Sequence, residues 1–153
     1  MNNDNASVKI TNRKAFYDYS VGERFEAGIV LNGAEVKSLR KGQASLSDSF
    51  VRVKNGEAFL INMYISPYEQ SEANSSESRR DRKLLLHKKQ ITSLLSKLAG
   101  SNLTVVPISC YNTHNLIKVE LALARGKKQF DKRESIKKKE QEREDQVIMR
   151  GKI

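Results

Sequence analysis

Apolar residues in the first 125 positions come in short runs separated by polar turns, a pattern typical of strands. The run 25–31 suits a buried strand, and Asn55 with Gly56 separates two β-rich runs. That dipeptide predicts a hairpin, because a type I′ turn needs positive φ at two successive residues. The runs 103–111 and 115–124 predict a second hairpin.

The second strand of that hairpin alternates with the period of two that a half-buried strand requires. We expect a short turn at residues 112–114 before it. The inward positions are then Ile117, Val119, Leu121 and Leu123. The outward positions are Lys118, Glu120, Ala122 and Ala124.

Two segments have helical patterns. Residues 33–42 lie between glycines and contain good helix formers, so we expect a short helix that ends at Gly42. Residues 88–100 carry apolar residues at the i, i+3, i+4, i+7 spacing of an amphipathic helix, with Gly100 as its stop. The apolar positions are Ile91, Leu94, Leu95 and Leu98.

Residues 1–11 and 67–82 are polar and lack a period, so we expect a disordered N-terminus and a long exposed loop. Apart from that loop, residues 12–128 supply five to six short strands. Closing such strands removes exposed edges, so the sequence predicts a mainly β fold, an OB-like antiparallel barrel with two or three short peripheral helices. Composition alone leaves a half-barrel or sandwich open. Residues 129–153 form a basic C-terminal tail.

The net charge of +10 indicates an anionic partner, nucleic acid before a membrane surface. The excess is spread along the chain, because residues 126–153 hold only ten basic and six acidic side chains of the total. A basic tail attached to a neutral body would instead concentrate the positive charge at the C-terminal end. The body itself is therefore expected to bind the partner.

Signatures of an enzyme are thin. The sequence has no GxxxxGK[ST], GxGxxG, HExxH or paired CxxC motif, so we expect no catalytic residues, no cofactor and no metal site. Cys110 and His114 invite a nucleophile–base interpretation, but a turn separates them and no third group orients them. One cysteine permits no intrachain disulfide, and no apolar run approaches the roughly 20 residues of a membrane span. We expect a soluble, cytoplasmic protein.

Basic residues gather in three groups, and nearby aromatics offer faces on which unpaired RNA bases can stack. The alternative for each residue is a solvated charge or a core aromatic. Arg13 and Lys14 with Phe16, Tyr17 and Tyr19 form the first group. The second is Arg79, Arg80, Arg82, Lys83, Lys88 and Lys89, and the third is the strip from Lys127 to Lys139.

Long motifs give the chain a family resemblance. The segments "NRKAFYDY", "GAEVKSLRKG", "RKLLLHKKQI" and "ALARGKKQFDKRE" resemble the SsrA-binding protein family, SmpB, in order and in register from residue 12 to about 140. The resemblance implies an OB-like barrel that binds the tRNA-like domain of transfer-messenger RNA. It implies delivery of that RNA, together with elongation factor Tu and GTP, to the A site of a stalled ribosome. It implies no active site.

The family's RNA-contacting positions match Asn12, Glu26, Leu85 and Lys118. Lys118 can meet a phosphate, whereas Glu26 either accepts hydrogen bonds from base edges and 2′-hydroxyls or forms a structural salt bridge. Leu85 is either a contact or a core residue. The full set of positions that we expect to bind transfer-messenger RNA is Asn12, Arg13, Lys14, Tyr17, Glu26, Arg80, Arg82, Lys83, Leu85 and Lys118.

Two departures from the family pattern concern this set. Family members commonly carry Arg-His where this chain has Phe16-Tyr17; a tyrosine can still stack on the RNA but brings no titratable charge. Many also carry Asp-Pro where Glu77-Ser78 stands here, so that only Arg80 and Arg82 of the loop match clearly.

The resemblance also implies a tail that is disordered in solution and becomes helical in the empty mRNA channel of the ribosome. Phe130 would then stack near the decoding bases, and an apolar pair near the end would anchor the helix. The expected ribosome contacts are Lys127, Lys128, Phe130, Asp131, Lys132, Arg133, Lys137, Lys138, Lys139, Ile148 and Met149.

Two other functions compete with this adaptor. A general OB-type factor would bind ribosomal RNA constitutively and would accept unrelated structured RNAs with similar affinity. An enzyme acting on RNA would need a nucleophile, a base and an orienting group, which the sequence does not supply.

Overall fold

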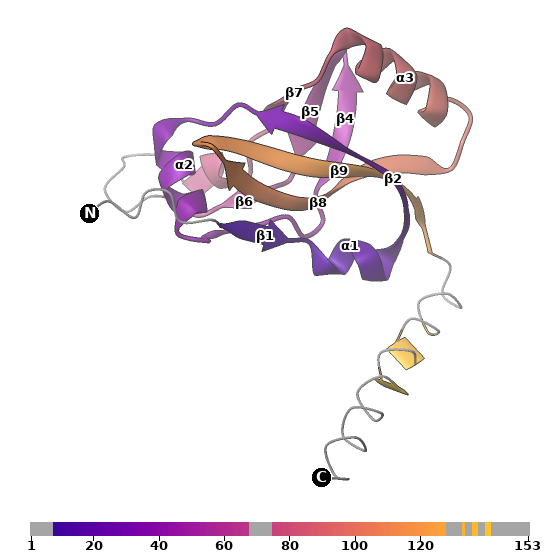
Figure 1. Ribbon diagram of the computed structural model, residues 1–153, viewed down its shortest axis with the longest axis horizontal. Coiled ribbons are helices and arrows are strands. Elements are labelled where there is room, and N and C mark those ends of the chain that lie inside the picture. Colours follow the sequence, from indigo (N-terminus) through magenta and orange to yellow (C-terminus); the bar gives the residue numbers. More distant parts are fainter. Residues whose placement is uncertain (1–7, 68–74, 128–132, 134–135, 138–139, 142–153) are drawn as a thin grey trace.

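The computed structural model describes residues 8–67, 75–127, 133, 136–137 and 140–141 (Figure 1). Several predicted tail contacts lie outside the described residues: Lys128, Phe130, Asp131, Lys132, Lys138, Lys139, Ile148 and Met149. The helices are α1 (Arg13–Asp18), α2 (Gly33–Arg40), α3 (Lys88–Leu98) and the 3₁₀ helix η1 (Ser75–Arg79). The strands are β1 (Lys9–Thr11), β2 (Tyr19–Ile29), β3 (Ala44–Ser45), β4 (Phe50–Lys54), β5 (Glu57–Ile61), β6 (Tyr64–Ile65), β7 (Arg82–Leu85), β8 (Leu103–Thr113) and β9 (Leu116–Gly126).

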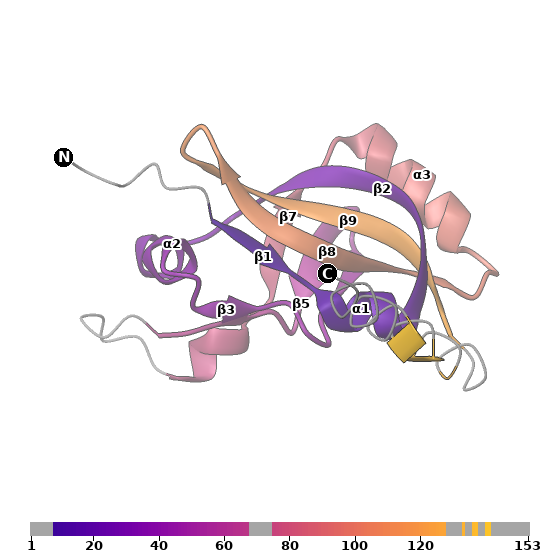
Figure 2. The ribbon, with the colours of Figure 1, turned by 60° about the horizontal axis from the view of Figure 1, so that its bottom comes forward.

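Six antiparallel strands form a closed ring in the order β8-β4-β5-β7-β2-β9, because β9 also pairs with β8 (Figure 2). The join between β4 and β8 is the weakest, a single pair of Val51 with Val105. Strand β1 adds to β8, and β3 pairs with β6 in a separate two-stranded sheet. The prediction of a mainly β, antiparallel fold with short peripheral helices is confirmed.

Both predicted hairpins are present. Asn55 and Gly56 have φ values of 54° and 75°, the left-handed conformations that a type I′ turn between β4 and β5 requires. The second turn lies later than expected, at His114 and Asn115, with φ values of 47° and 67°. The prediction of a turn at 112–114 therefore begins two residues too early. Asn112 and Thr113 belong to β8, because they still pair with residues 117 and 116 of β9.

The core fills the ring. The inward residues of β9 predicted from the sequence are all buried, as are Leu60 and Leu84 from the opposite strands. Ala122 and Ala124 are buried as well, which contradicts the prediction that they face solvent. For Ala124 the reason is α1, whose Ala15 packs with Ala124 and Val106 in a second small cluster outside the ring.

The helices begin and end where their sequences indicate. Asn32 caps α2 in a capping box with Glu35, and Gly42 follows that helix with a φ of 75°. In α3, Ile91 and Leu94 are buried, whereas Leu95 is 47% exposed, so the buried stripe is narrower than predicted.

Two segments predicted to lack structure are partly ordered. Residues 9–11 form β1, so the prediction of disorder through residue 11 is wrong for these three: their backbone pairs with residues 109–111 of β8. The predicted loop 67–82 contains η1 and ends inside the protein, because β7 begins at the buried Arg82.

Candidate nucleic-acid interface

A row of side chains crosses four strands on the outer face of the ring. The register pairs Tyr111 of β8 with Lys118 of β9, Lys118 with Gly28 of β2, and Gly28 with Leu85 of β7. Directly opposed residues in an antiparallel sheet share a face. Their sequence neighbours Cys110, Val119, Ala27 and Leu84 are buried, so this row faces outward. We call Tyr111, Lys118, Gly28, Leu85 and the adjoining Glu26 the outer row.

Glu26 links the polar residues of the outer row. Its carboxylate accepts a hydrogen bond from the Tyr111 hydroxyl and lies 3.6 Å from the Lys118 ammonium. Partial burial and the hydrogen bond to Glu26 raise the pKa of Tyr111 to about 12, so the phenol stays protonated and remains a donor. Half of the Glu26 side chain is exposed, so its carboxylate can also accept bonds from a ligand. The two interpretations of Glu26 are thus compatible.

Leu85 is an exposed residue, not a core residue. Its side chain is 55% exposed and lies against Gly28, where an added Cβ would approach Leu85 to 3.3 Å. Glycine at that position lets Leu85 lie flat on the sheet. The outer row therefore combines an apolar surface, a cation, a carboxylate and a phenol within one patch, and three predicted contacts meet there.

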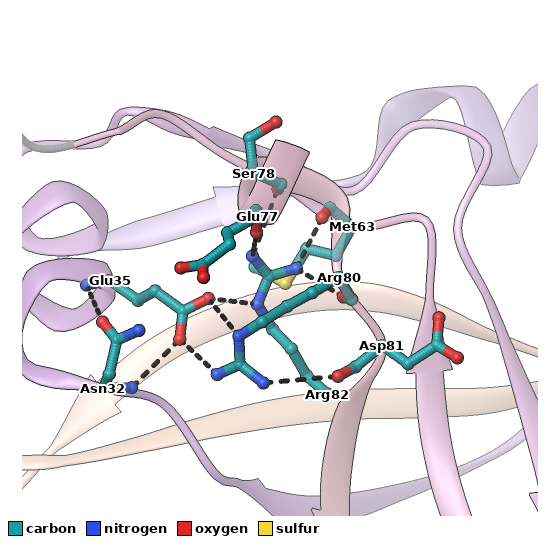
Figure 3. Close-up of polar contacts among 8 residues, drawn as sticks. All are labelled: Asn32, Glu35, Met63, Glu77, Ser78, Arg80, Asp81 and Arg82. Carbon is teal, nitrogen blue, oxygen red and sulfur yellow. Dashed lines mark hydrogen bonds and ion pairs between the residues drawn. The ribbon is translucent and has the colours of Figure 1, made fainter. Parts of the chain in front are cut away.

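Arg82 occupies a different place from the one predicted. Its side chain is fully buried, and its Nε donates to Glu35 at 2.7 Å (Figure 3). The four remaining N–H groups have backbone acceptors, namely the carbonyl oxygens of Met63, Arg80, Glu77 and Ser78. All five donors of the guanidinium are satisfied inside the protein. Arg82 therefore ties the loop to the body and offers no surface to RNA.

Arg80 completes this network from the surface side. Its guanidinium binds the same carboxylate with two nitrogens, Nε at 3.1 Å and Nη2 (Figure 3). Burial raises the pKa of Glu35, but hydrogen bonds from Arg80, from the Asn32 amide and from Arg82 outweigh it and lower the pKa below its ordinary value. The Arg80 side chain remains 35% exposed, so part of it is open to solvent.

Asn12 is also structural in this fold. It is 4% exposed, and its side-chain amide donates to the carbonyl oxygens of Leu46 and Pro107 while its oxygen caps α1 at Ala15. A predicted RNA contact is thus fully engaged in holding α1 against the ring. Its buried position removes it from any surface that we assign to RNA.

Helix α1 presents the remaining N-terminal group. Arg13 is exposed, and Lys14 donates to Asp48 at 2.6 Å, which together with the charge of Asp48 raises the pKa of Lys14. Phe16 is 37% exposed, with the Arg24 guanidinium 5.5 Å from its ring. Tyr17 is half-buried on the same helix. These side chains form a cationic and aromatic surface around α1.

The root of the tail contacts α1. The Lys127 ammonium donates to the Phe16 carbonyl at 3.0 Å, and the Lys127 amide donates to the Asp18 carbonyl at 2.9 Å. The tail therefore leaves the body beside α1 (Figure 1). Further along, Arg133, Ile136 and Lys137 have helical backbone and exposed side chains. The expectation that the tail is disordered in solution and gains helix only in the mRNA channel stays a prediction.

The two residues considered for catalysis differ in their surroundings, because one is buried and the other is exposed. Cys110 is fully buried and burial raises the pKa of its thiol to about 12, so the reactive thiolate is strongly disfavoured. His114 lies in the exposed β8–β9 turn. Within the described residues no three His, Cys, Asp or Glu side chains are grouped to hold a metal ion, and no helix is long and apolar enough to cross a membrane.

The sequence matches the model of the family described as "SmpB protein" over residues 9–151. The chain belongs to the SmpB family. Among its relatives, the SsrA-binding protein of Sulfurihydrogenibium sp. (strain YO3AOP1) is 49% identical over 95% of this chain and 96% of its own length. That of Geotalea uraniireducens (strain Rf4) is 52% identical over 91% of this chain and 92% of its own length.

A solved structure agrees with the SmpB assignment. A chain from the study "tmRNA-SmpB: a journey to the center of the bacterial ribosome" is 48% identical and has a TM-score of 0.66. The match covers 79% of this chain and 85% of that chain.

In this SmpB-family chain, sequence reasoning missed two residues of the sites. The sequence predicted a strand at Tyr111 but no function for its side chain. Because Tyr111 follows the buried Cys110 in a strand, its aromatic side chain faces outward, beside Lys118. Glu35 was placed in a helix without a partner. No local pattern could pair it with Arg82, which is 47 residues away.

Proposed function

We propose that this chain is the RNA-binding adaptor of trans-translation and binds the tRNA-like domain of transfer-messenger RNA. The observation that carries the proposal is the outer row, where three predicted RNA contacts from strands far apart in sequence form one patch. The relatives named SsrA-binding protein and the solved structure of tmRNA with SmpB support the choice of RNA.

Each group of the outer row has a distinct part in binding. Lys118 exchanges its 3.6 Å contact with Glu26 for a phosphate, which offers a stronger charge partner and releases counterions. Glu26 then accepts from a 2′-hydroxyl or a base edge, while the Tyr111 hydroxyl keeps its carboxylate in place. Leu85 contributes apolar contact to a sugar or base. Arg13, Lys14 and Tyr17 on α1, with Lys83 on β7 and the open face of Arg80, extend the contacts to neighbouring phosphates.

The tail supplies the second half of the proposed function. Because it leaves the body beside α1, an RNA held by the body and a tail in the vacant mRNA channel can engage together. We propose that Lys127, Arg133 and Lys137, with the tail positions outside the described residues, contact the small-subunit decoding centre. Elongation factor Tu with GTP would join through the charged RNA, and the cytoplasm is then the site of action. The chain would act without turnover.

A competition experiment tests this division of labour. Full-length chain and a chain ending at residue 130 are titrated with the tRNA-like domain of transfer-messenger RNA against bulk tRNA at fixed salt. We expect selective binding that survives truncation, together with loss of stalled-ribosome release. A constitutive ribosomal-RNA binder would bind both RNAs alike. If truncation abolished RNA binding, the assignment of RNA to the body would be wrong.

A pair of variants tests the outer row itself. Lys118→Gln removes a cation from the row, whereas Lys97→Gln removes one from α3, where Lys97 pairs with Glu23 at 2.7 Å. Loss of one phosphate contact should weaken binding and reduce the salt slope of log K by about 1. We expect this for Lys118→Gln only. Equal salt slopes for the two variants would show that Lys118 does not contact the RNA.

A further inference from the structure

A second outward row crosses β4, β5 and β7. The register pairs Arg52 with Phe59 and Phe59 with Lys83, so a ring stands between two cations on adjacent strands. Ala58 and Leu60, on either side of Phe59, are fully buried, so the half-buried Phe59 faces outward. As register partners on adjacent strands roughly 4.8 Å apart, Arg52 and Lys83 flank Phe59 at the level of the backbone.

The charge of this face favours an anion. Lys54 lies two residues after Arg52 on the same face, and neither has an ion pair within the described part of the chain. Arg52 instead lies over the Phe50 ring at 5.5 Å from its centroid. Only Lys83 has an acidic partner here, Glu57 at 3.3 Å, and both side chains are about half exposed. Lys54 lies directly opposite Glu57 in the register, so among the residues that the structure describes Arg52 is the one of these three cations that is left uncompensated and available to a phosphate.

We propose that Arg52, Phe59 and Lys83 form a binding platform for a single-stranded RNA segment, with an unpaired base stacked on Phe59 and phosphates held by the flanking cations. An aromatic ring on an outer face can stack on a base of any identity, and cations on both sides can contact the RNA backbone. A duplex is excluded from this contact because its base faces are stacked on one another. The platform is continuous with the outer row, since Lys83 and Leu85 lie two residues apart on the same face of β7.

The platform makes separate predictions for its ring and for its cations. The probe is a fluorescein-labelled ten-nucleotide oligoadenylate, and binding to the full chain is followed by anisotropy over a range of salt. Phe59→Leu keeps an apolar side chain and removes the aromatic face, so we expect at least a five-fold loss of affinity with an unchanged salt slope. Phe59→Tyr keeps the face and should bind within two-fold of the parent.

Arg52→Gln should reduce the salt slope by about 0.7, the value for one contact with single-stranded phosphate. Lys97→Gln is the charge-matched control, and it should leave the slope unchanged. In NMR spectra the ring protons of Phe59 should shift on addition of the oligonucleotide, which tests stacking even if Phe59→Leu folds poorly. A ten-base-pair duplex should cause no such shift.

The proposal is overturned if Phe59→Leu binds oligoadenylate as the parent does, or if the Phe59 protons stay in place while the chain is saturated. Binding would then run through the tail or α1. These outcomes are independent of the outer row, because Lys118→Gln should weaken binding of the tRNA-like domain and leave the oligoadenylate affinity within two-fold.

Discussion

Replacing Glu35 with glutamine should destabilise this protein far more than loss of a surface charge. Among the described residues, Glu35 is the only acidic partner of the fully buried Arg82, and its carboxylate also binds Arg80. Glutamine has almost the same shape and can preserve the capping box at the start of α2. The substitution therefore removes the charge and the second acceptor oxygen, to which Arg80 Nε and Arg82 Nε donate.

The magnitude follows from the burial of Arg82. Breaking a buried ion pair by removing one partner typically costs about 3–5 kcal/mol, since the other charge is left uncompensated. The four carbonyl oxygens around the Arg82 guanidinium still accept its hydrogen bonds, so we expect a value near the lower end, about 3 kcal/mol. Glu35→Ala should cost about 1 kcal/mol more, because the hydrogen bond from the Asn32 backbone amide to the Glu35 side chain is lost as well.

The assay is urea unfolding followed by far-ultraviolet circular dichroism at neutral pH. Glu23→Gln is the matched control, because Glu23 pairs with Lys97 at 2.7 Å but 62% of its side chain is exposed. Exposed pairs contribute under about 1 kcal/mol. A Glu35→Gln protein no less stable than Glu23→Gln would refute the reasoning and show that the carbonyl cage alone holds Arg82.

The same pair of proteins gives a dependence on pH. The pKa of Glu35 is lowered in the folded state from an ordinary value of 4.5, so its charge contributes stability above that value. The contribution is lost as pH falls through the lower folded pKa. The stability difference between the parent and Glu35→Gln should therefore be constant at neutral pH and shrink below about pH 4.5. A difference that grew on acidification would have the wrong sign.

Three further outcomes follow from single residues. Asn12→Ala should cost about 2 kcal/mol in urea unfolding, since it removes a helix cap and two buried hydrogen bonds; a loss below 0.5 kcal/mol would contradict the structural role. Gly28→Ala should displace Leu85 and weaken RNA binding while leaving the urea midpoint nearly unchanged, and parent-like RNA affinity would count against an apolar contact there. Cys110 should not react with Ellman's reagent at pH 8 until the protein unfolds; rapid labelling of native protein would show an open core.

Local patterns predicted the elements of this fold well. The positive-φ dipeptide at Asn55 and Gly56, the capped helix before Gly42 and the alternation around Lys118 depend on near neighbours in sequence. The burial of Ala124 was missed, because burial of a small residue depends on whether another element covers that face. Here α1 does so, more than 100 residues earlier in the chain.

The candidate site divides in the same way. Glu26, Lys118 and Leu85 were identified through the family resemblance, and the register of the strands brings them together. Asn12 and Arg82 were predicted to lie in the same interface, yet both side chains are buried. There they donate hydrogen bonds to backbone carbonyl groups that are distant in sequence. A motif records that a residue matters for the protein. Whether its side chain points outward or inward depends on packing.

The pairing of β2 with β9 has a consequence for synthesis of the chain. Tyr19 pairs with Gly126, so one of the first strands made must wait for the last. Such long-range pairings are slow to form, because a large loop must close before any contact compensates for it. The ring can close only after residue 126 is available, and the tail is the segment made next. A nascent copy of this protein therefore cannot close its ring before residue 126 has left the ribosome.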